Sequence, residues 1–189
     1  MEGPLTSLAI ANDAYVAPGA VLSGDVRMAA ESSVFHGSVL RGEAAHVEIG
    51  RQANVQDNCI VEGTPGNPAR IGARVSLGHN ARVFGATVEE RSLIAIGATV
   101  LSGAVIGAQS IVAANAVVPE GMVVPPRTLV IGQGRLLREV TDAEIARIEH
   151  GATDYARLSR EYRLGVPSPS GRPTPRASRL ASGAPGGPG

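Results

Sequence analysis

Aliphatic residues recur at every sixth position between Val88 and Val124, and this spacing constrains the fold more than any other feature of the sequence. The positions are Val88, Ile94, Val100, Ile106, Val112, Val118 and Val124. An α-helix repeats every 3.6 residues and a strand every 2, so neither produces a period of six. A coil of three short strands does, because each side contributes one inward aliphatic residue. A run of hexapeptides is therefore typical of a parallel β-helix.

The same register extends back to Ile10 with three interruptions, and all nineteen of its positions are aliphatic. Seventeen of the nineteen residues four places further on are Ala, Ser, Thr, Val or Cys, as expected at tight corners. The interruptions separate Leu40 from Ile49, Val61 from Ile71, and Val83 from Val88. Insertions in a solenoid form loops, and loops often carry function. The sequence predicts about six coils, with function between residues 40 and 88.

Composition narrows the class of protein further. The chain has 189 residues, 43% of them apolar and only 3% aromatic, which fits one domain with a core of small aliphatic side chains. Its net charge is zero and no basic stripe is present, so we expect no nucleic-acid partner. All seventeen cationic residues are Arg, which excludes catalysis by a lysine amine. With no signal-peptide pattern or long apolar run, we expect a cytoplasmic protein without membrane contact.

The C-terminal third changes character after the repeat. Pro125-Pro126 halts the hexapeptides, so residues 1–126 are predicted to form the β-helix. Thr141 and Glu144 form a capping-box pattern that predicts a helix over about 141–163. Its apolar face contains Ile145, Ile148, Ala152, Tyr155, Leu158 and Tyr162. Residues 127–164 are therefore a connector and a helix that packs on the solenoid, and the Pro, Gly and Ser-rich residues 165–189 are expected to be a disordered tail.

Three polar motifs carry a family resemblance. They are Arg41-Gly42-Glu43, Asn54-Val55-Gln56-Asp57 and Gly78-His79. Together with the capped terminal helix, they resemble the gamma-class carbonic anhydrase family over about residues 8–163. The resemblance implies a left-handed β-helix and a homotrimer with active sites in clefts between subunits. It also implies a zinc ion held by three histidines, two from one subunit and one from the next, that activates water for attack on carbon dioxide.

The zinc ligands carry over only in part. The first family ligand falls on Glu62, the second on His79 and the third on Phe84. A phenyl ring cannot donate an electron pair to a metal, and a catalytic zinc usually keeps three protein ligands. We therefore predict that the protein binds no cofactor and no metal. His79 is the only family ligand that is retained, and a bound zinc ion is the alternative.

The side chains around the implied cleft have candidate roles that follow from their chemistry and from the family positions. His79 is the candidate catalytic acid or base, with Glu62 as its partner or as a second proton acceptor. Gln56 matches the residue that orients the reacting water in the family. Its alternative role, without a metal, is to orient a ligand.

Three further residues are predicted to contact a small molecule in the cleft. Arg41 and Asp57 resemble an ion pair between subunits, and Phe84 makes the cleft more apolar. Glu43 replaces the Asp of the family motif and changes its geometry by one methylene group.

The remaining histidines and the single cysteine lie outside the family's ligand positions. His36 and His46 are predicted to be surface or interface residues, with His46 near the first interruption. His150 is predicted to be solvated on the helix, and Cys59 to be a small packing residue.

Three functions remain open at this stage. The first is an enzyme, a lyase, hydrolase or acyltransferase, that acts on a small organic or acyl substrate by metal-independent acid/base chemistry. The second is a non-catalytic trimer that binds a metabolite or a protein. The third is a residual zinc-dependent carbonic anhydrase or a hexapeptide acyltransferase.

Overall fold

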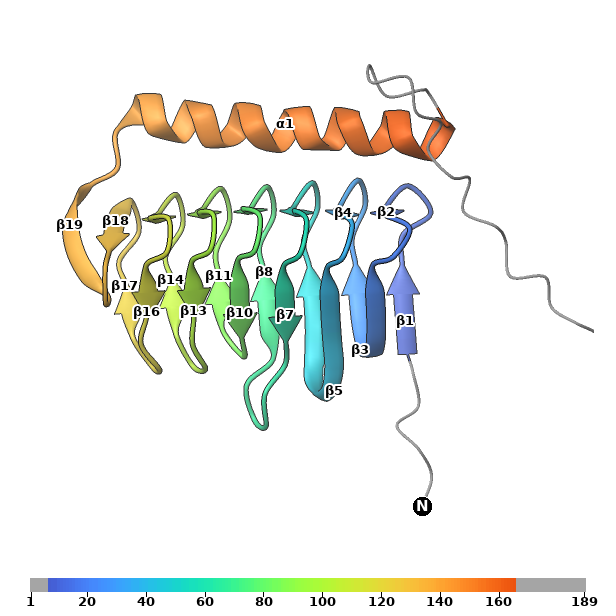
Figure 1. Cartoon of the computed structure of the whole chain (residues 1–189). Helices are drawn as coiled ribbons and strands as arrows, with labels where there is room; N and C mark the ends of the chain where they lie inside the picture. The colour runs from blue at the N-terminus through green and yellow to red at the C-terminus, as the bar shows by residue number, and fades with distance from the viewer. Residues whose placement is uncertain (1–6, 166–189) are drawn as a thin grey trace, which may run out of the picture.

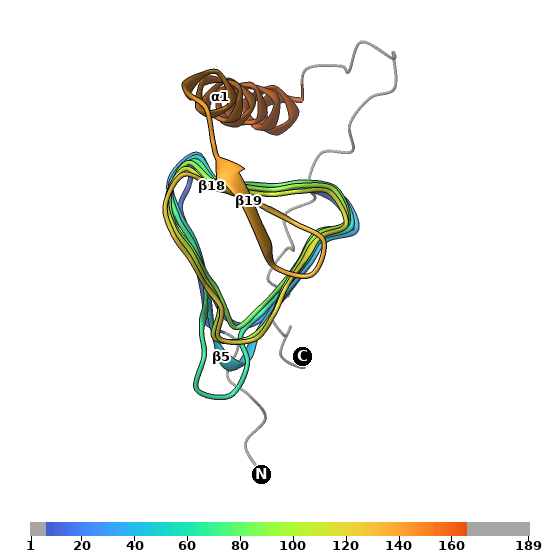
Figure 2. The same cartoon turned by 90° about the vertical axis from the view of Figure 1, so that its left-hand side faces the viewer.

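The computed structural model describes residues 7–165, and most of this chain winds into a stack of short parallel strands. Seen along its axis, the stack is a triangle with one helix lying along one side (Figure 2). The predicted hexapeptide coil is therefore confirmed. In most turns each side of the triangle is one short strand, because the corners follow one another closely along the chain.

The side of the triangle beneath the helix is a ladder to which each turn contributes one strand, so its strands give the number of turns. Its parallel strands are β2 (Tyr15–Val16), β4 (Ser33–Val34), β6 (Asn54–Val55), β9 (Ser76–Leu77), β12 (Leu93–Ile94), β15 (Ile111–Val112) and β18 (Thr128–Ile131). The sequence predicted about six coils, and this ladder has seven rungs. The extra rung is β18, which pairs with β15 although it follows the two prolines. The antiparallel strand β19 (Arg135–Glu139) then closes this end of the ladder.

The other two sides of the triangle belong to one sheet of eleven strands. They are β1 (Ser7–Ile10), β3 (Val21–Met28), β5 (Val39–Ile49), β7 (Ile60–Glu62), β8 (Ala69–Ile71), β10 (Arg82–Phe84), β11 (Thr87–Val88), β13 (Thr99–Val100), β14 (Val105–Ile106), β16 (Val117–Val118) and β17 (Val123–Val124). The long strands β3 and β5 run through the corner and so join the two sides. A Cβ atom on Gly42 would overlap the backbone of Asp25 on the preceding turn, so this bend requires glycine.

All three interruptions of the repeat fall at this one corner, which we call the insertion corner. It consists of the middle of β5, the segment 63–68 and the segment 85–86. The longest insertion closes on itself between Thr64 and Asn67, whose backbone groups exchange two hydrogen bonds. It projects from the stack between β7 and β8 (Figure 1). The Thr64 and Asn67 side chains also bond the Ser102 hydroxyl, which fixes the loop against a later turn.

The interior contains the aliphatic register that the sequence showed. Of the nineteen positions, sixteen are buried, and the exceptions are Ile10, Val16 and Leu22 in the first turn. Burying one Val, Leu or Ile side chain contributes about 1.5–3 kcal/mol. The chain is thus a left-handed parallel β-helix followed by an α-helix, as predicted.

Helix α1 (Asp142–Leu164) runs back along the ladder from β18 to β2 (Figure 1). Its capping box is present, since Thr141 and Glu144 exchange hydrogen bonds, and Gly165 ends it in a left-handed conformation. Near its C-terminus, Tyr155, Leu158 and Tyr162 pack against Tyr15, Ala17 and Phe35. Of the predicted tail, residues 166–189 lie outside the described residues. No helix within residues 7–165 is long and apolar enough to cross a membrane.

Candidate active site

A column of three polar side chains stands on the corner between the helix-facing ladder and the strands β5, β7 and β10. His36, Asp57 and His79 occupy this corner in three successive turns. The Nδ1 atom of His79 lies 3.1 Å from one Asp57 oxygen, and Nδ1 of His36 lies 3.4 Å from the other. The side chain of His79 is 42% exposed, so its ring remains accessible to solvent. One carboxylate therefore lies between two imidazoles.

The local backbone explains why these side chains point outward. The residues that follow them, Gly37, Asn58 and Asn80, have φ values of 71°, 59° and 60°. Glycine and asparagine tolerate this left-handed conformation better than other residues. Each corner therefore turns sharply immediately after the polar residue and leaves its side chain on the outside.

His36 is the member of this column that the sequence interpretation assigned only to the surface or an interface. The signal that identifies it is the repeat itself. His36, Asp57 and His79 each stand two places after an inward aliphatic residue, at Val34, Val55 and Leu77. Residues at equivalent positions of successive coils stack about 4.8 Å apart.

A second column lies at the other end of the same strands. Arg41, Glu62 and Phe84 are register partners on β5, β7 and β10. An Arg41 nitrogen lies 3.9 Å from Glu62 and another lies 3.6 Å from Glu43. Ser23 donates a hydrogen bond of 2.7 Å to Glu43, and this bond holds the pKa of that carboxyl below its ordinary value.

Within one chain the two columns do not meet. His79 precedes β10 and Phe84 ends it, so the two columns lie at opposite ends of the same short strands, five positions apart along the chain. The carboxylate beside His79 is consequently Asp57, whereas Glu62 is paired with Arg41. Among the described residues of one chain, no ion pair joins His79 to Glu62 or Arg41 to Asp57.

Gln56 points in a different direction from its neighbour Asp57. It is 8% exposed and lies beneath α1, where its Nε2 donates to Asn54, which in turn donates to Ser76. Gln56 is therefore part of a buried polar ladder on the helix-facing side.

The family's zinc does not fit the side chains that occupy its ligand positions. Phe84 presents only carbon atoms next to Glu62, its partner in register. Among residues 7–165 of a single chain, no three His, Cys, Asp or Glu side chains are grouped closely enough to hold a metal ion. Of the three positions to which the resemblance assigns zinc ligands, one carries a carboxylate and one a phenyl ring, and only His79 has an imidazole.

The other residues singled out in the sequence have structural surroundings. Cys59 is fully buried, and burial raises the pKa of its thiol to about 12, so it remains protonated and inert. His150 is 80% exposed on α1, where its Nε2 lies 3.3 Å from Asp154. His46 lies on β5 and is half-buried.

The fold and the corner sites place the chain among the hexapeptide-repeat proteins, and solved structures agree. A hexapeptide transferase family protein from Anaplasma phagocytophilum superimposes with a TM-score of 0.75 at 30% identity, over 82% of this chain and 92% of that one. A Bacillus cereus protein described as a suspected acetyltransferase superimposes with a TM-score of 0.82 at 30% identity, over 84% and 92%.

Sequence relatives identify the family more closely, although no family model matches the chain. The "Probable carbonic anhydrase" of Methanocaldococcus jannaschii is 46% identical over 79% of this chain and 95% of its own length. The carbonic anhydrase of Geobacillus kaustophilus is 39% identical over 82% and 85%. Gamma carbonic anhydrase 1 of Arabidopsis thaliana is 38% identical, and this chain spans 57% of its length. The chain therefore belongs to the gamma carbonic anhydrase-like family of hexapeptide-repeat proteins.

Proposed function

We propose that this protein forms a homotrimer in which His79, positioned by Asp57, transfers protons on a small organic or acyl substrate. The substrate lies between the corner column of one subunit and the Arg41, Glu62 and Phe84 column of the next. No metal takes part in the reaction. The protein is then an enzyme of lyase, hydrolase or acyltransferase type that works in the cytoplasm.

The observation that carries this proposal is the 3.1 Å contact between His79 Nδ1 and Asp57. A carboxylate at Nδ1 favours the tautomer whose proton is on that nitrogen, which leaves Nε2 as a proton acceptor. Within the described part of the chain, Nε2 of His79 has no hydrogen-bond partner, so it is available to a substrate. Asp57 thus performs the orienting role that carboxylates perform for catalytic histidines.

The opposite column supplies binding groups of a different kind. Arg41 carries a positive charge that is 52% exposed, and Phe84 adds an apolar ring two rungs away, on the other side of Glu62. A small molecule with an anionic or carbonyl oxygen and an apolar part matches these two groups. Glu62 lies 3.9 Å from Arg41, so the two opposite charges are neighbours in this column.

Carbonic anhydrase activity is the second candidate, and it is favoured by the printed names of the relatives at 39–46% identity. The side chains at the ligand positions argue against it, because Phe84 removes one ligand and Glu62 replaces another. A non-catalytic trimer that binds a metabolite or a protein would use the same cleft without proton transfer.

The first test is independent of any substrate. Long-range nitrogen–proton NMR of the wild type is expected to show His79 with its proton on Nδ1 at high pH. Asp57→Asn removes the charge with little change in shape and is expected to lower the population of this tautomer. An unchanged tautomer in the variant would contradict the orienting role of Asp57.

The second test uses activity on a panel of small esters and thioesters, with carbon dioxide hydration measured in parallel. General acid–base catalysis contributes about 10²–10⁴-fold to rates, so His79→Ala should lose at least a hundredfold. His150→Ala, which removes an exposed histidine on α1, is the matched control and should keep full activity. A loss below about tenfold in His79→Ala would instead favour the binding trimer.

A further inference from the structure

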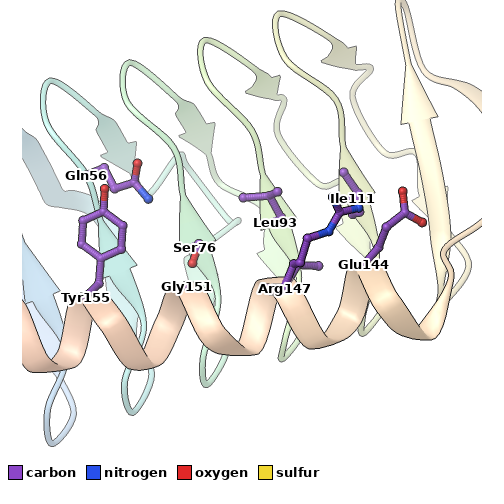
Figure 3. A pocket seen from close by; sticks show the side chains of 9 residues that line it. Gln56, Ser76, Leu93, Ile111, Glu144, Arg147, Gly151 and Tyr155 are labelled. Carbon is purple, nitrogen blue, oxygen red and sulfur yellow. The ribbon is translucent and has the colours of Figure 1, made fainter.

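A pocket of about 320 Å³ lies between α1 and the helix-facing ladder (Figure 3). Four successive turns of the solenoid line its floor, and one face of the helix forms its roof. The floor residues are Gln56, Ser76, Leu93 and Ile111, and the roof residues are Glu144, Arg147, Ile148, Gly151 and Tyr155. Its volume is at the lower end of the range for small-molecule sites. The pocket therefore suits a single small ligand.

Gly151 keeps this space open. It stands in the interior of α1, where glycine costs about 1 kcal/mol relative to alanine. A Cβ atom at this position would meet no atom within 4 Å. The helix and the floor consequently leave a gap here that a larger side chain would fill.

The end of the pocket near Gln56 is polar and rigid. Asn54, Ser76 and Gln56 are joined by hydrogen bonds of 2.8 and 3.1 Å and are at least nine-tenths buried. Tyr155 closes this end, and its ring is held 5.3 Å from that of Phe35 in an edge-on contact. Burial raises the pKa of the Tyr155 hydroxyl, so it keeps its proton and can donate to an oxygen atom.

The opposite end carries a positive charge. Arg147 lies beside Ile111 and Glu144 (Figure 3). Glu144 is already paired with Arg138, whose nitrogens lie 2.8 and 2.9 Å from its two oxygens. Within residues 7–165, Arg147 itself has no ion pair. An anion at this end would therefore meet a guanidinium that lacks a counterion.

The middle of the pocket is apolar, and its length sets the shape of the ligand. Leu93 lines it from the ladder and Ile148 lines it from the helix. Successive rungs of a sheet are about 4.8 Å apart, so the three steps from the Gln56 rung to the Ile111 rung span roughly 14 Å. An aliphatic chain placed along this axis would contact both walls.

We propose that this pocket binds an elongated aliphatic carboxylate, with its carboxylate on Arg147 and a hydroxyl or carbonyl oxygen at the Gln56 and Tyr155 end. The apolar chain lies between Leu93 and Ile148. This binding is independent of proton transfer by His79, although the pocket ends at Gln56, next to Asp57 in the chain. This proposal gives a role to the buried hydrogen-bonded side chains Asn54, Ser76 and Gln56, which take no part in proton transfer by His79.

The test is calorimetric titration of the full chain with octanoate, ω-hydroxyoctanoate and 1-octanol. Both acids are expected to bind saturably, with the hydroxy acid tighter and the alcohol at least about tenfold weaker than octanoate. Arg147→Gln should weaken octanoate about tenfold and leave 1-octanol unchanged. The matched control is Arg157→Gln, which removes an exposed arginine from the same helix outside the pocket.

Filling the pocket tests its location. Gly151→Leu should abolish octanoate binding, whereas Gly151→Ala should retain it, and circular dichroism checks that both variants keep the fold. The proposal is overturned if neither acid binds the wild type, if the alcohol binds as tightly as the acids, or if folded Gly151→Leu still binds octanoate. Arg147→Gln changes only an exposed side chain and should fold normally. Its affinity for octanoate therefore tests the proposal even if Gly151→Leu does not fold.

Discussion

At the scale of residues, the corner position decides what each side chain can do. The same position of the repeat carries Pro18, His36, Asp57, His79 and Ile96 in five successive turns. Only the middle three are polar, and stacking brings each histidine to within 3.4 Å of the shared Asp57. A periodic scaffold thus assembles a cluster from residues that are far apart in sequence.

A prediction at this scale concerns the lost metal ligands. We expect the purified protein to hold far less than one zinc per chain. Glu62→His combined with Phe84→His should raise zinc content towards one per chain, because these register partners would place two imidazoles side by side. Elemental analysis after dialysis measures this change. The control pair Glu62→Gln with Phe84→Leu should gain no zinc, and stoichiometric zinc in the wild type would contradict the prediction.

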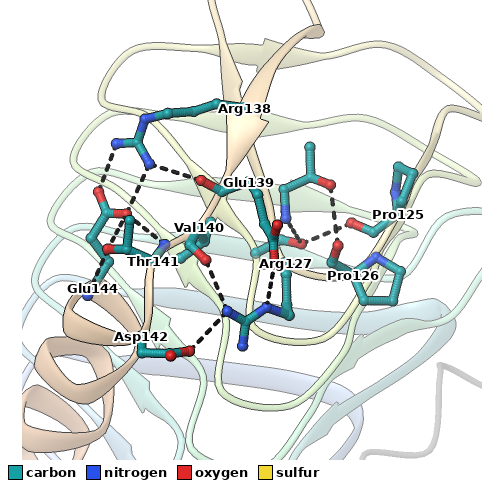
Figure 4. A network of polar contacts seen from close by, with 11 residues as sticks. Pro125, Pro126, Arg127, Arg138, Glu139, Val140, Thr141, Asp142 and Glu144 are labelled. Carbon is teal, nitrogen blue, oxygen red and sulfur yellow. Dashed lines mark hydrogen bonds and ion pairs between the residues drawn. The ribbon is translucent and has the colours of Figure 1, made fainter.

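At the scale of elements, α1 is fixed at both ends by specific contacts. Its start is held by the capping box and by Arg138, which bonds Glu144 (Figure 4). Arg127 extends this network, since it bonds Glu139 and Asp142 and thereby ties the last rung of the ladder to the helix. At the other end, Arg160 lies 3.0 Å from Glu31. These contacts set the position of the helix along the solenoid.

The second prediction follows from Glu144. Hydrogen bonds from Arg138 and then Thr141 hold its pKa well below its ordinary value of about 4.3. A depressed pKa in the folded state stabilises the fold above the ordinary pKa, and this stabilisation is lost as pH falls below it. The melting temperature of Glu144→Gln should therefore lie below that of the wild type at pH 7, and the difference should shrink between about pH 4 and pH 2.

Glu161→Gln is the control for this measurement, since Glu161 pairs with Arg157 near the exposed end of the same helix. Its melting temperature should follow the wild type over the same pH range. A difference for Glu144→Gln that stays constant as pH falls would show that the charge of Glu144 does not stabilise α1.

At the scale of the whole molecule, the two columns of the candidate active site lie at opposite edges of one side of the triangle. The corner column lies at one edge of the side formed by β5, β7 and β10, and the Arg41 column lies at its other edge. The homotrimer that we propose would place the first edge of one subunit against the second edge of the next. This arrangement would also cover Val21, which is 52% exposed on the same side.

The third prediction concerns this assembly. Light scattering should give a mass three times that of the chain. Arg41→Ala should shift the protein towards monomers with little change in circular dichroism. Its contacts within the chain are exposed and long, so they stabilise the coil only slightly, whereas its loss would leave the Asp57 of a neighbouring subunit without a counterion. Arg157→Ala is the control and should remain trimeric. A monomeric wild type would remove the intersubunit cleft altogether.

The coil, its core and the capped helix follow from local sequence patterns. Residues such as Leu77 and Ile94 follow a period that only stacked three-sided turns can bury, and Thr141 with Glu144 marks the helix start locally. The last rung was missed because Pro125 and Pro126 suggested an end, yet β18 pairs with β15 beyond them.

Which side chains meet depends on contacts between turns and between the helix and the solenoid. The direction of a corner side chain depends on the backbone conformation of the next residue, and this separates Asp57, which points outward to His36 and His79, from Gln56, which lies buried under α1. The pocket under α1 likewise depends on how far the helix stands from the ladder at Gly151. Periodicity fixes the spacing along the solenoid axis, whereas packing between distant segments fixes the distances across it.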